Sequence, residues 1–475
     1  MKRFAALAAA AAITLQPVAF PVSAVAAEPY HFDPGRDRPP PPQDNPDPGV
    51  EMKQQTECAT SAVLDDSQFH TIPAHEAFSV DKLHDFATGK GVTVGVIDSG
   101  VQPNVRLPHL RGAGDYVAND GDGLHDCDHH GTLIAGIIAA SPARDDSFVG
   151  IAPDADILSI RQTSSAYTVA NHDDEPPSSL STLAKSVRRA TDEGAQVINM
   201  SVTACYPATK KAELSELAGA LAYAASKDVV LVASAGNVGD DCDANPGPDP
   251  EDADDPRGWD TATTISVPSM FDDFVLSVGG VGLQGHPYPK SLPGPWVDVS
   301  APAESIVSLD PVSGETGGLI NADVTQQGVQ PITGTSFAAA YVSGLAALMK
   351  QAHPDWSAVQ IRRQITETAH HTPEAQNNLL GNGIVDSVAA LTNDPAGDRA
   401  YRQHIDPASR REPQPISQIN WWPIGGGLAT ILGAVLVGVW LLFRRHVETI
   451  DPPKPSGDIE PDPDEDVFKE RGRHA

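Results

Sequence analysis

Segments with strand-like and helix-like patterns alternate through the middle of this 475-residue chain, beginning at Gly91. The strand-like runs are short and rich in Val and Ile, and the longer segments between them have helical spacing of their apolar residues. This alternation predicts an α/β fold in which helices cover both faces of a mostly parallel sheet. The expected strands are Val92–Ile97, Ala155–Ile160, Gln196–Met200, Val229–Ala233 and Phe274–Val278. The expected helices are Thr132–Ala140, Ser181–Glu193, Glu213–Lys227, Tyr341–Met349, Trp356–Thr368 and Val385–Leu391.

Three residues with complementary chemistry lie at the ends of these segments. Asp98 ends the first strand, His130 opens a helix, and Ser336 lies in a small-residue turn before an apolar helical run. A serine at a helix start lies near unpaired N–H groups that stabilise negative charge, but its hydroxyl needs a histidine base and an orienting carboxylate. The chain supplies both, and the order Asp, His, Ser is that of subtilisin among the serine-protease triads.

Five motifs in this order resemble those of the subtilisin-like serine proteases. They are V-I-D-S-G at 96–100, H-G-T-L-I-A-G at 130–136, N-M-S at 199–201, A-G-N at 235–237 and G-T-S-F-A at 334–338. The resemblance covers roughly residues 80–391 and implies a three-layer fold with a mostly parallel central sheet flanked by helices. Within this family the chain is similar to the mycosins, the membrane-anchored proteases of actinobacterial type VII secretion systems.

The resemblance implies a role for each matching residue. Ser336 is expected to be the nucleophile, His130 the general base and then acid, and Asp98 the carboxylate that orients His130. Asn237 matches the side-chain donor to the oxyanion, and the backbone N–H of Ser336 would be the second donor. Ser201 matches a strand edge that pairs with an extended peptide substrate.

His129 lies directly before His130, so the histidine could be assigned to either position. The family places Gly-Thr immediately after the catalytic histidine, which selects His130 and leaves His129 as an expected solvent-side neighbour. The run 126–130 also resembles a metal cluster, but metal ligands must converge, and Cys127 has a likelier use in a disulfide.

Acidic residues outnumber basic ones and give a formal net charge of -31. A surface that binds nucleic acid or anionic lipid needs a basic excess, so no nucleic-acid partner is expected. Two acidic inserts, 172–179 and 240–259, lack the ordered ligand spacing of a calcium loop. We expect them to be solvated loops beside the cleft, and we expect no metal and no cofactor.

Four cysteines allow three pairings. In the subtilase arrangement, Cys205 and Cys242 follow two neighbouring strand ends and lie on one rim, which favours pairing them. That leaves Cys58 with Cys127, a bridge that would attach the N-terminal arm near the candidate histidine. An arm held in this way would remain in the working enzyme after a single cut.

The N-terminus combines a basic start, an apolar run and a small-residue site, which predicts a cleaved signal peptide at 1–27 rather than a membrane anchor. Residues 28–80 are expected to form a Pro-rich extension that packs on a peptidase domain at 81–394. A polar linker, 395–420, follows.

Residues 421–443 carry no charge and would span about 34 Å as a helix, enough to cross a bilayer core of about 30 Å. Arg444 and Arg445 follow immediately, which predicts a cytoplasmic tail at 444–475 and an extracytoplasmic peptidase domain. A buried core helix is the weaker interpretation of this run.

Together these features predict a single-pass, membrane-anchored serine endopeptidase that processes secreted proteins and supports a type VII secretion complex. Its partners would be protein or peptide substrates and membrane components of that system. Two alternatives stay open: a mainly structural component of the secretion complex, or a general cell-surface housekeeping protease. The sequence alone does not specify the substrate.

Overall fold

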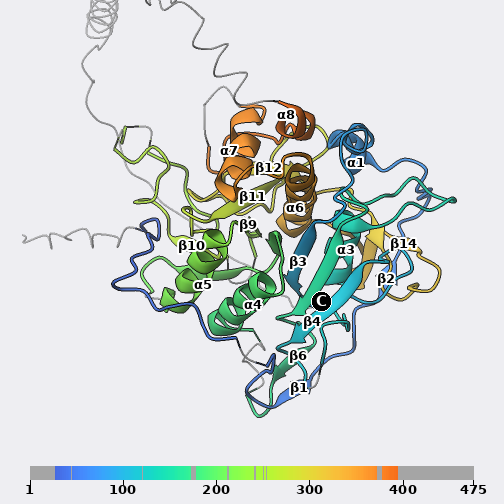
Figure 1. Ribbon diagram of the computed structural model, residues 1–475, viewed down its shortest axis with the longest axis horizontal. Helices are drawn as coiled ribbons and strands as arrows, with labels where there is room; N and C mark the ends of the chain where they lie inside the picture. Colours follow the sequence, from blue (N-terminus) through green and yellow to red (C-terminus); the bar gives the residue numbers. More distant parts are fainter. Residues whose placement is uncertain are drawn as a thin grey trace, which may run out of the picture. The chain divides into compact units, whose positions relative to one another are not determined.

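The computed structural model describes residues 27–393 except 44, 120, 173–177, 211–212, 240–241, 250, 253 and 372–376. Seven strands of the described part form a parallel sheet in the order β12-β11-β9-β7-β3-β5-β4 (Figure 1). The predicted α/β fold with a mostly parallel central sheet is confirmed. The strands are β3 (Thr93–Asp98), β4 (Leu110–Asp115), β5 (Asp156–Arg161), β7 (Val197–Met200), β9 (Val230–Ser234), β11 (Val275–Val281) and β12 (Val299–Pro302).

Helices cover both faces of this sheet because side chains alternate along each strand. Val94 and Val96 of β3 belong to one apolar cluster with helices α3 and α6, whereas Ile97 belongs to a second cluster with α4 and α5. The predicted helices are present with ends shifted by a few residues, and α6 is longer than predicted. They are α3 (His130–Ala139), α4 (Leu180–Asp192), α5 (Ser215–Ser226), α6 (Thr335–Ala352), α7 (Ala358–Thr368) and α8 (Ser387–Thr392).

The two edge strands, β4 and β12, are absent from the sequence prediction. β4 reads L-R-G-A-G-D and is buried only in its second half, so it lacks the apolar run that marks the central strands. β12 has four residues and ends at Pro302. Proline is tolerated at a sheet edge but argues against a central strand, so neither segment shows a clear strand pattern.

The N-terminal extension lies along the peptidase domain as a long, mostly irregular segment, drawn in blue in Figure 1. The Tyr30 ring lies 4.9 Å from the Phe271 ring, measured between centroids. A Cβ added to Gly219 of α5 would lie 2.2 Å from the carbonyl oxygen of Arg38, so only glycine allows this close approach.

Further along, the extension adds strands to the domain. β1 (Met52–Gln54) pairs antiparallel with β6 (Tyr167–Val169), and β2 (Ser61–Ala62) pairs antiparallel with β15 (Ala322–Thr325). The remaining short elements are α1 (Pro73–Ala77), α2 (Val80–Leu83), β8 (Ala204–Pro207), β10 (Thr264–Val267), β13 (Ser308–Leu309), β14 (Leu319–Ile320) and β16 (Gly328–Pro331). Chain segments far apart in sequence are therefore joined by backbone hydrogen bonds.

Two disulfides join the four cysteines. Cys58 pairs with Cys127 across 69 residues, and their Cα atoms are 4.6 Å apart. Cys205 pairs with Cys242, with a Cα–Cα distance of 5.3 Å. The first bridge ties the extension to the loop before α3, and the second ties β8 to the loop after β9.

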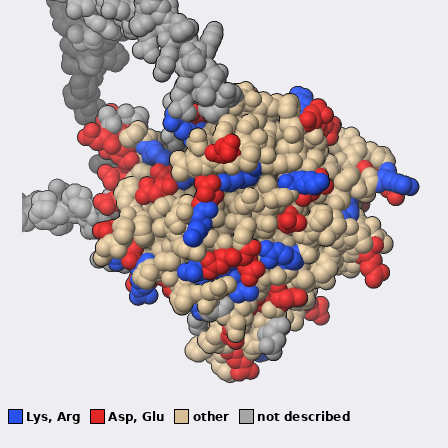
Figure 2. Space-filling model, in the orientation of Figure 1, with Lys and Arg blue, Asp and Glu red and all other residues tan. Residues whose placement is uncertain are grey.

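The described helices include none that is both long and apolar enough to span a bilayer. The predicted signal peptide, except its last residue, the linker, the predicted span at 421–443 and the tail lie outside the described residues. The surface shown in Figure 2 intersperses Lys and Arg with Asp and Glu, without a continuous basic patch on that face.

Because the extension is bridged to Cys127 and paired with β6 and β15, we predict that it remains attached in the purified protein. N-terminal sequencing of the protein after export should begin near Glu28, and mass spectrometry should find Cys58 bonded to Cys127. A sequence beginning near Val80, with Cys58 missing, would refute this prediction.

Candidate active site

The first contact at the site joins Asp98 to His130. Asp98 is the last residue of β3 and is buried, and His130 is the first residue of α3. His130 Nδ1 lies 2.7 Å from Asp98 Oδ1, which fits a charge-assisted hydrogen bond. The His130 side chain keeps about a third of its surface exposed, at 32%. The ring is thus fixed on its Asp98 side and open on another.

Ser336 is placed by α6, the helix behind the site. Gly334 precedes the helix with φ 152°, and every residue from Thr335 to Lys350 is buried. Ser336 and Ser201 contact each other twice: Ser201 Oγ donates to the Ser336 carbonyl at 2.9 Å, and Ser336 Oγ donates to the Ser201 carbonyl at 3.4 Å. Among the described residues, no hydrogen bond joins Ser336 to His130.

Asn237 lies beside this helix start, after β9. Its side-chain oxygen accepts hydrogen bonds from the backbone N–H of Thr335 at 3.1 Å and from the Thr335 hydroxyl at 3.3 Å. With the oxygen engaged in this way, the amide nitrogen makes no hydrogen bond within the described part of the chain. Two N–H groups of Asn237 are therefore available to a ligand beside Ser336.

Ser201 follows β7 directly, and its side chain is buried. Asn199 Nδ2 donates to Ser201 Oγ at 2.9 Å, while that hydroxyl donates to Ser336. The Ser201 side chain thus supports the helix start, and any pairing with a peptide would use the backbone here.

The charge around His130 is strongly negative. Partial burial of the imidazole lowers its pKa, but the carboxylates of Asp98, Asp126 and Asp128 outweigh this and raise the pKa of His130 to about 9. Among the three carboxylates, Asp98 raises the pKa of His130 most, because it also accepts a hydrogen bond from the ring. At neutral pH the ring is therefore mostly protonated.

The expectation that His129 faces solvent is wrong. His129 is buried, with a left-handed backbone at φ 66°. Its Nδ1 lies 3.5 Å from Ser61 Oγ of the extension and 3.6 Å from Asp323 Oδ1 of β15. The extension covers the ring, and nothing local in the sequence shows that a segment 68 residues away would do so.

The two aspartates just before α3, Asp126 and Asp128, accept hydrogen bonds from neighbouring residues. Asp126 accepts from Ser99 and Thr132, and Asp128 accepts from Ser164 and Ser165. These partners were not among the predicted site residues. An aspartate shortly before a helix start is a common acceptor for its free N–H groups, and this signal is visible in the sequence.

One group of possible metal ligands converges within the described residues: Cys58, His125 and Cys127. Its two sulfurs are joined in a disulfide, so they are not thiolates that could bind a metal. Residues 173–177 and parts of the second acidic insert lie outside the described residues.

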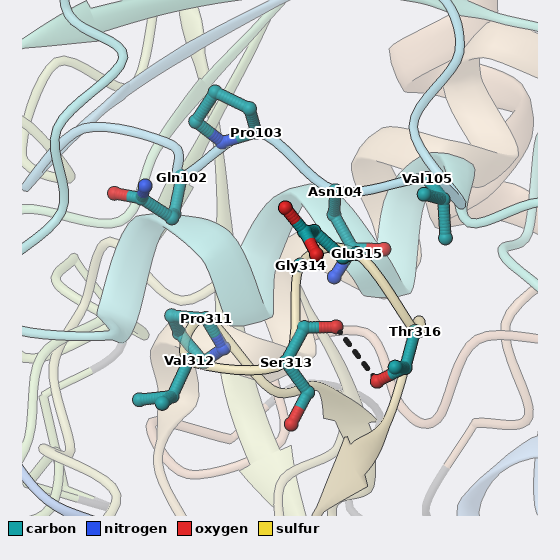
Figure 3. Close-up of a pocket in the computed structure, with 10 residues that line it drawn as sticks. All are labelled: Gln102, Pro103, Asn104, Val105, Pro311, Val312, Ser313, Gly314, Glu315 and Thr316. Carbon is teal, nitrogen blue, oxygen red and sulfur yellow. Dashed lines mark hydrogen bonds between the residues drawn. The ribbon is translucent and has the colours of Figure 1, made fainter.

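A hollow of about 720 Å³ lies between the loop after β3 and the loop joining β13 to β14 (Figure 3). It reaches the active-site helix through Gln102, whose backbone N–H donates to Thr132 Oγ1 at 2.9 Å. None of the candidate site residues lines it. The lining residues are Gln102, Pro103, Asn104, Val105, Pro311, Val312, Ser313, Gly314, Glu315 and Thr316.

A parallel α/β sheet that brings an aspartate and a histidine together, with a serine at the start of a buried helix, is the arrangement of subtilisin-like serine proteases. The family model described as the subtilase family matches residues 89–383.

Similarity to three known proteins identifies a narrower group within this class. The chain is 44% identical over 434 residues to Mycosin-1 of Mycobacterium tuberculosis (strain ATCC 25618 / H37Rv), an alignment that covers 88% of this chain and 95% of the relative. The solved serine protease MycP1, an essential component of the type VII (ESX-1) secretion system, superimposes with TM-score 0.72 and 43% identity over 77% of this chain and all of that chain. A chain of the intact ESX-5 inner membrane complex matches with TM-score 0.74 and 38% identity over 88% of this chain and all of that one. The chain belongs to the mycosins within the subtilase family of serine proteases.

We predict that His130 titrates near pH 9. In an NMR titration of the folded protein, its ring signals should have a midpoint near 9, and Asp98→Asn should move the midpoint to lower pH by removing the largest favourable charge. The signals are assigned by comparison with His130→Gln. A midpoint at or below the ordinary value of about 6.5 would contradict the prediction.

Proposed function

We propose that this chain is an extracytoplasmic, membrane-anchored serine endopeptidase that acts through Asp98, His130 and Ser336. The observation that carries the proposal is the 2.7 Å contact between His130 and Asp98 at the end of a sheet where Ser336 begins a buried helix. An aspartate placed in this way fixes the ring tautomer and stabilises the imidazolium that forms when the ring takes a proton.

In the proposed reaction, Ser336 Oγ attacks the carbonyl carbon of the scissile peptide bond while its proton passes to His130 Nε2. The tetrahedral adduct then breaks its C–N bond, and His130 returns the proton to the leaving amine. Water attacks the acyl-enzyme by the same route and releases the carboxyl product. Before attack, Ser336 Oγ must turn from the Ser201 carbonyl toward His130, and such contacts commonly tighten only when substrate binds.

The negative oxygen of the adduct would be stabilised by the side-chain N–H of Asn237 and the backbone N–H of Ser336. Thr335 supports this role because it engages the Asn237 oxygen and so leaves the amide nitrogen free to donate to a ligand. An extended substrate would pair with the backbone after β7 near Ser201, as an added strand.

We infer a signal peptide at 1–27, a retained extension at 28–80, a peptidase domain at 81–394, a linker at 395–420, a membrane helix at 421–443 and a cytoplasmic tail at 444–475. Similarity to MycP1 and to a chain of the ESX-5 inner membrane complex supports service in a type VII secretion system. The same similarity favours a second role, as a structural member of that membrane complex.

The catalytic assignment predicts the labelling of two variants and the peptide turnover of a third. A fluorophosphonate should label the purified ectodomain on Ser336, and labelling should be lost in Ser336→Ala and His130→Ala. Asn237→Asp keeps an oxygen for Thr335 but removes the N–H donor, so peptide turnover should fall by about 10²- to 10³-fold.

Thr335→Val serves as the control for the Asn237 variant, because it removes the hydroxyl contact and leaves the Asn237 N–H groups in place. Its turnover should stay well above that of Asn237→Asp. Folded, disulfide-intact wild type that resists labelling would overturn the assignment.

Protease and scaffold roles predict different outcomes in a cell that carries the secretion system. Deletion of the chain should abolish secretion in either case. Ser336→Ala, produced at wild-type level, should block substrate processing if proteolysis matters, whereas preserved secretion would assign the essential role to the scaffold. Secretion that survives the deletion itself would favour a housekeeping protease instead.

A further inference from the structure

A second buried carboxylate, Asp126, lies behind the pair formed by Asp98 and His130. It is 6% exposed. Its Oδ2 accepts from the Thr132 backbone N–H at 2.8 Å and from the Thr132 hydroxyl at 2.5 Å. Its Oδ1 accepts from Ser99 Oγ at 2.8 Å and from the Asp128 backbone N–H at 3.2 Å.

Two of the four contacts come from backbone N–H groups, which can only donate, and two come from hydroxyls, which can also accept. An ionised carboxylate can accept all four of these hydrogen bonds at once. Burial, and to a smaller extent the nearby Asp98, raise the pKa of Asp126 above its ordinary value, although the hydrogen bonds from Thr132 and Ser99 act in the opposite direction. A charge kept in such a buried place costs stability, and four donors compensate for that cost.

Asp126 reaches Asp98 through Ser99. The Ser99 hydroxyl lies 2.8 Å from Asp126 Oδ1 and 3.2 Å from Asp98 Oδ1, and it accepts a hydrogen bond from the Gly131 backbone N–H at 2.9 Å. One hydroxyl therefore joins the residue after Asp98 to the residue after His130.

Asp126 also reaches His130 through the first turn of α3. Thr132 lies two residues after His130, and both its backbone N–H and its hydroxyl donate to Asp126. The first turn of a helix has N–H groups without partners inside the helix, so this carboxylate satisfies one of them and fixes where the helix starts.

We propose that Asp126 is a positioning residue for the hydrolysis proposed above. Through Ser99 and Thr132 it holds Asp98 and His130 at hydrogen-bonding distance from each other, and its charge favours the imidazolium that forms during catalysis. It touches neither substrate nor the reacting atoms. The inference rests on the proposed role of His130.

Other groups also face His130, and their effects on the ring must be distinguished from the effect of Asp126. Within the described chain these are the carboxylates of Asp98 and Asp128, and the Phe337 ring of α6, whose centroid lies 5.4 Å from that of the imidazole. Asp128 is a matched control because it is two residues from Asp126 and acidic, but it hydrogen-bonds Ser164 and Ser165 on a different loop.

The test compares Asp126→Asn, Asp128→Asn and Ser99→Ala with wild type in the full ectodomain. Two quantities are measured: the fluorophosphonate labelling rate of Ser336 from pH 6 to 10.5, and the His130 titration midpoint by NMR. Asp126→Asn should lower the plateau rate about tenfold or more and move both midpoints to lower pH, since the lost charge favoured the protonated ring.

Two controls distinguish the effect of Asp126 on the positions of Asp98 and His130 from the effect of its charge on the His130 ring. Asp128→Asn should move the midpoints slightly and keep the plateau rate within about threefold of wild type. Ser99→Ala keeps both carboxylates, so it should lower the plateau with a smaller midpoint shift than Asp126→Asn. If Asp126→Asn fails to fold by circular dichroism, Ser99→Ala decides the positioning claim.

Two results would overturn the inference. The first is an unchanged plateau rate in both Asp126→Asn and Ser99→Ala. The second is equal behaviour of Asp126→Asn and Asp128→Asn, which would reduce Asp126 to one charge among several. If wild type itself fails to label, the proposed function is at fault, and the NMR midpoints still test Asp126 without activity.

Discussion

The burial of α6 is the constraint on which the rest of the structure depends. Every residue from Thr335 to Lys350 is buried, so the helix packs closely against the residues around it. Gly344 marks how close this packing is, since a Cβ there would lie 2.5 Å from the Ile151 Cβ. Ser343 adds a buried hydrogen bond to Asn199 at 2.9 Å. A helix fixed on all sides holds its first turn, and with it Ser336, at a defined point beyond the strand ends.

The opposite wall of the site is organised by charge. The charges of Asp98, Asp126 and Asp128 all act on one imidazole, and their combined field favours the protonated ring. Such a field has two effects on a general base: it stabilises the imidazolium of the reaction, and it lowers the fraction of enzyme that begins with a neutral ring. The fraction of protein with a neutral His130 ring, which a general base requires, is therefore larger at alkaline pH than at neutral pH.

The parts of the fold that follow from local pattern were predictable from sequence. Central strands such as β3 and β7 carry continuous apolar runs, and α4 and α7 have polar faces with helical spacing, so both patterns are visible locally. The edge strands β4 and β12 are short or glycine-bearing and depend on their neighbours for their conformation. These strands form because they pair with strands far away in the sequence, so the local sequence pattern does not predict them.

The candidate site divides in the same way. Asp98, His130 and Ser336 lie at segment ends, and motif order suffices to single them out. The burial of His129 required knowledge that Ser61 would cover it, and the use of Asp126 required knowledge that Ser99 and Thr132 meet around it. Contacts between residues far apart in sequence supply this information, and no single motif contains it.

One contact of the extension has a consequence for the timing of folding. Ser61 donates to Asp310 at 2.6 Å across 249 residues, beside the ring of His129, and β2 pairs with β15. Contacts that close loops of this length form late, because the loop entropy must be overcome before they contribute stability. The start of α3, which His129 precedes and His130 opens, therefore reaches its final surroundings only after residues 310–325 have docked. Under the proposed function, a nascent chain exported from its N-terminus would stay inert toward its own unfolded segments until nearly the whole peptidase domain had crossed the membrane.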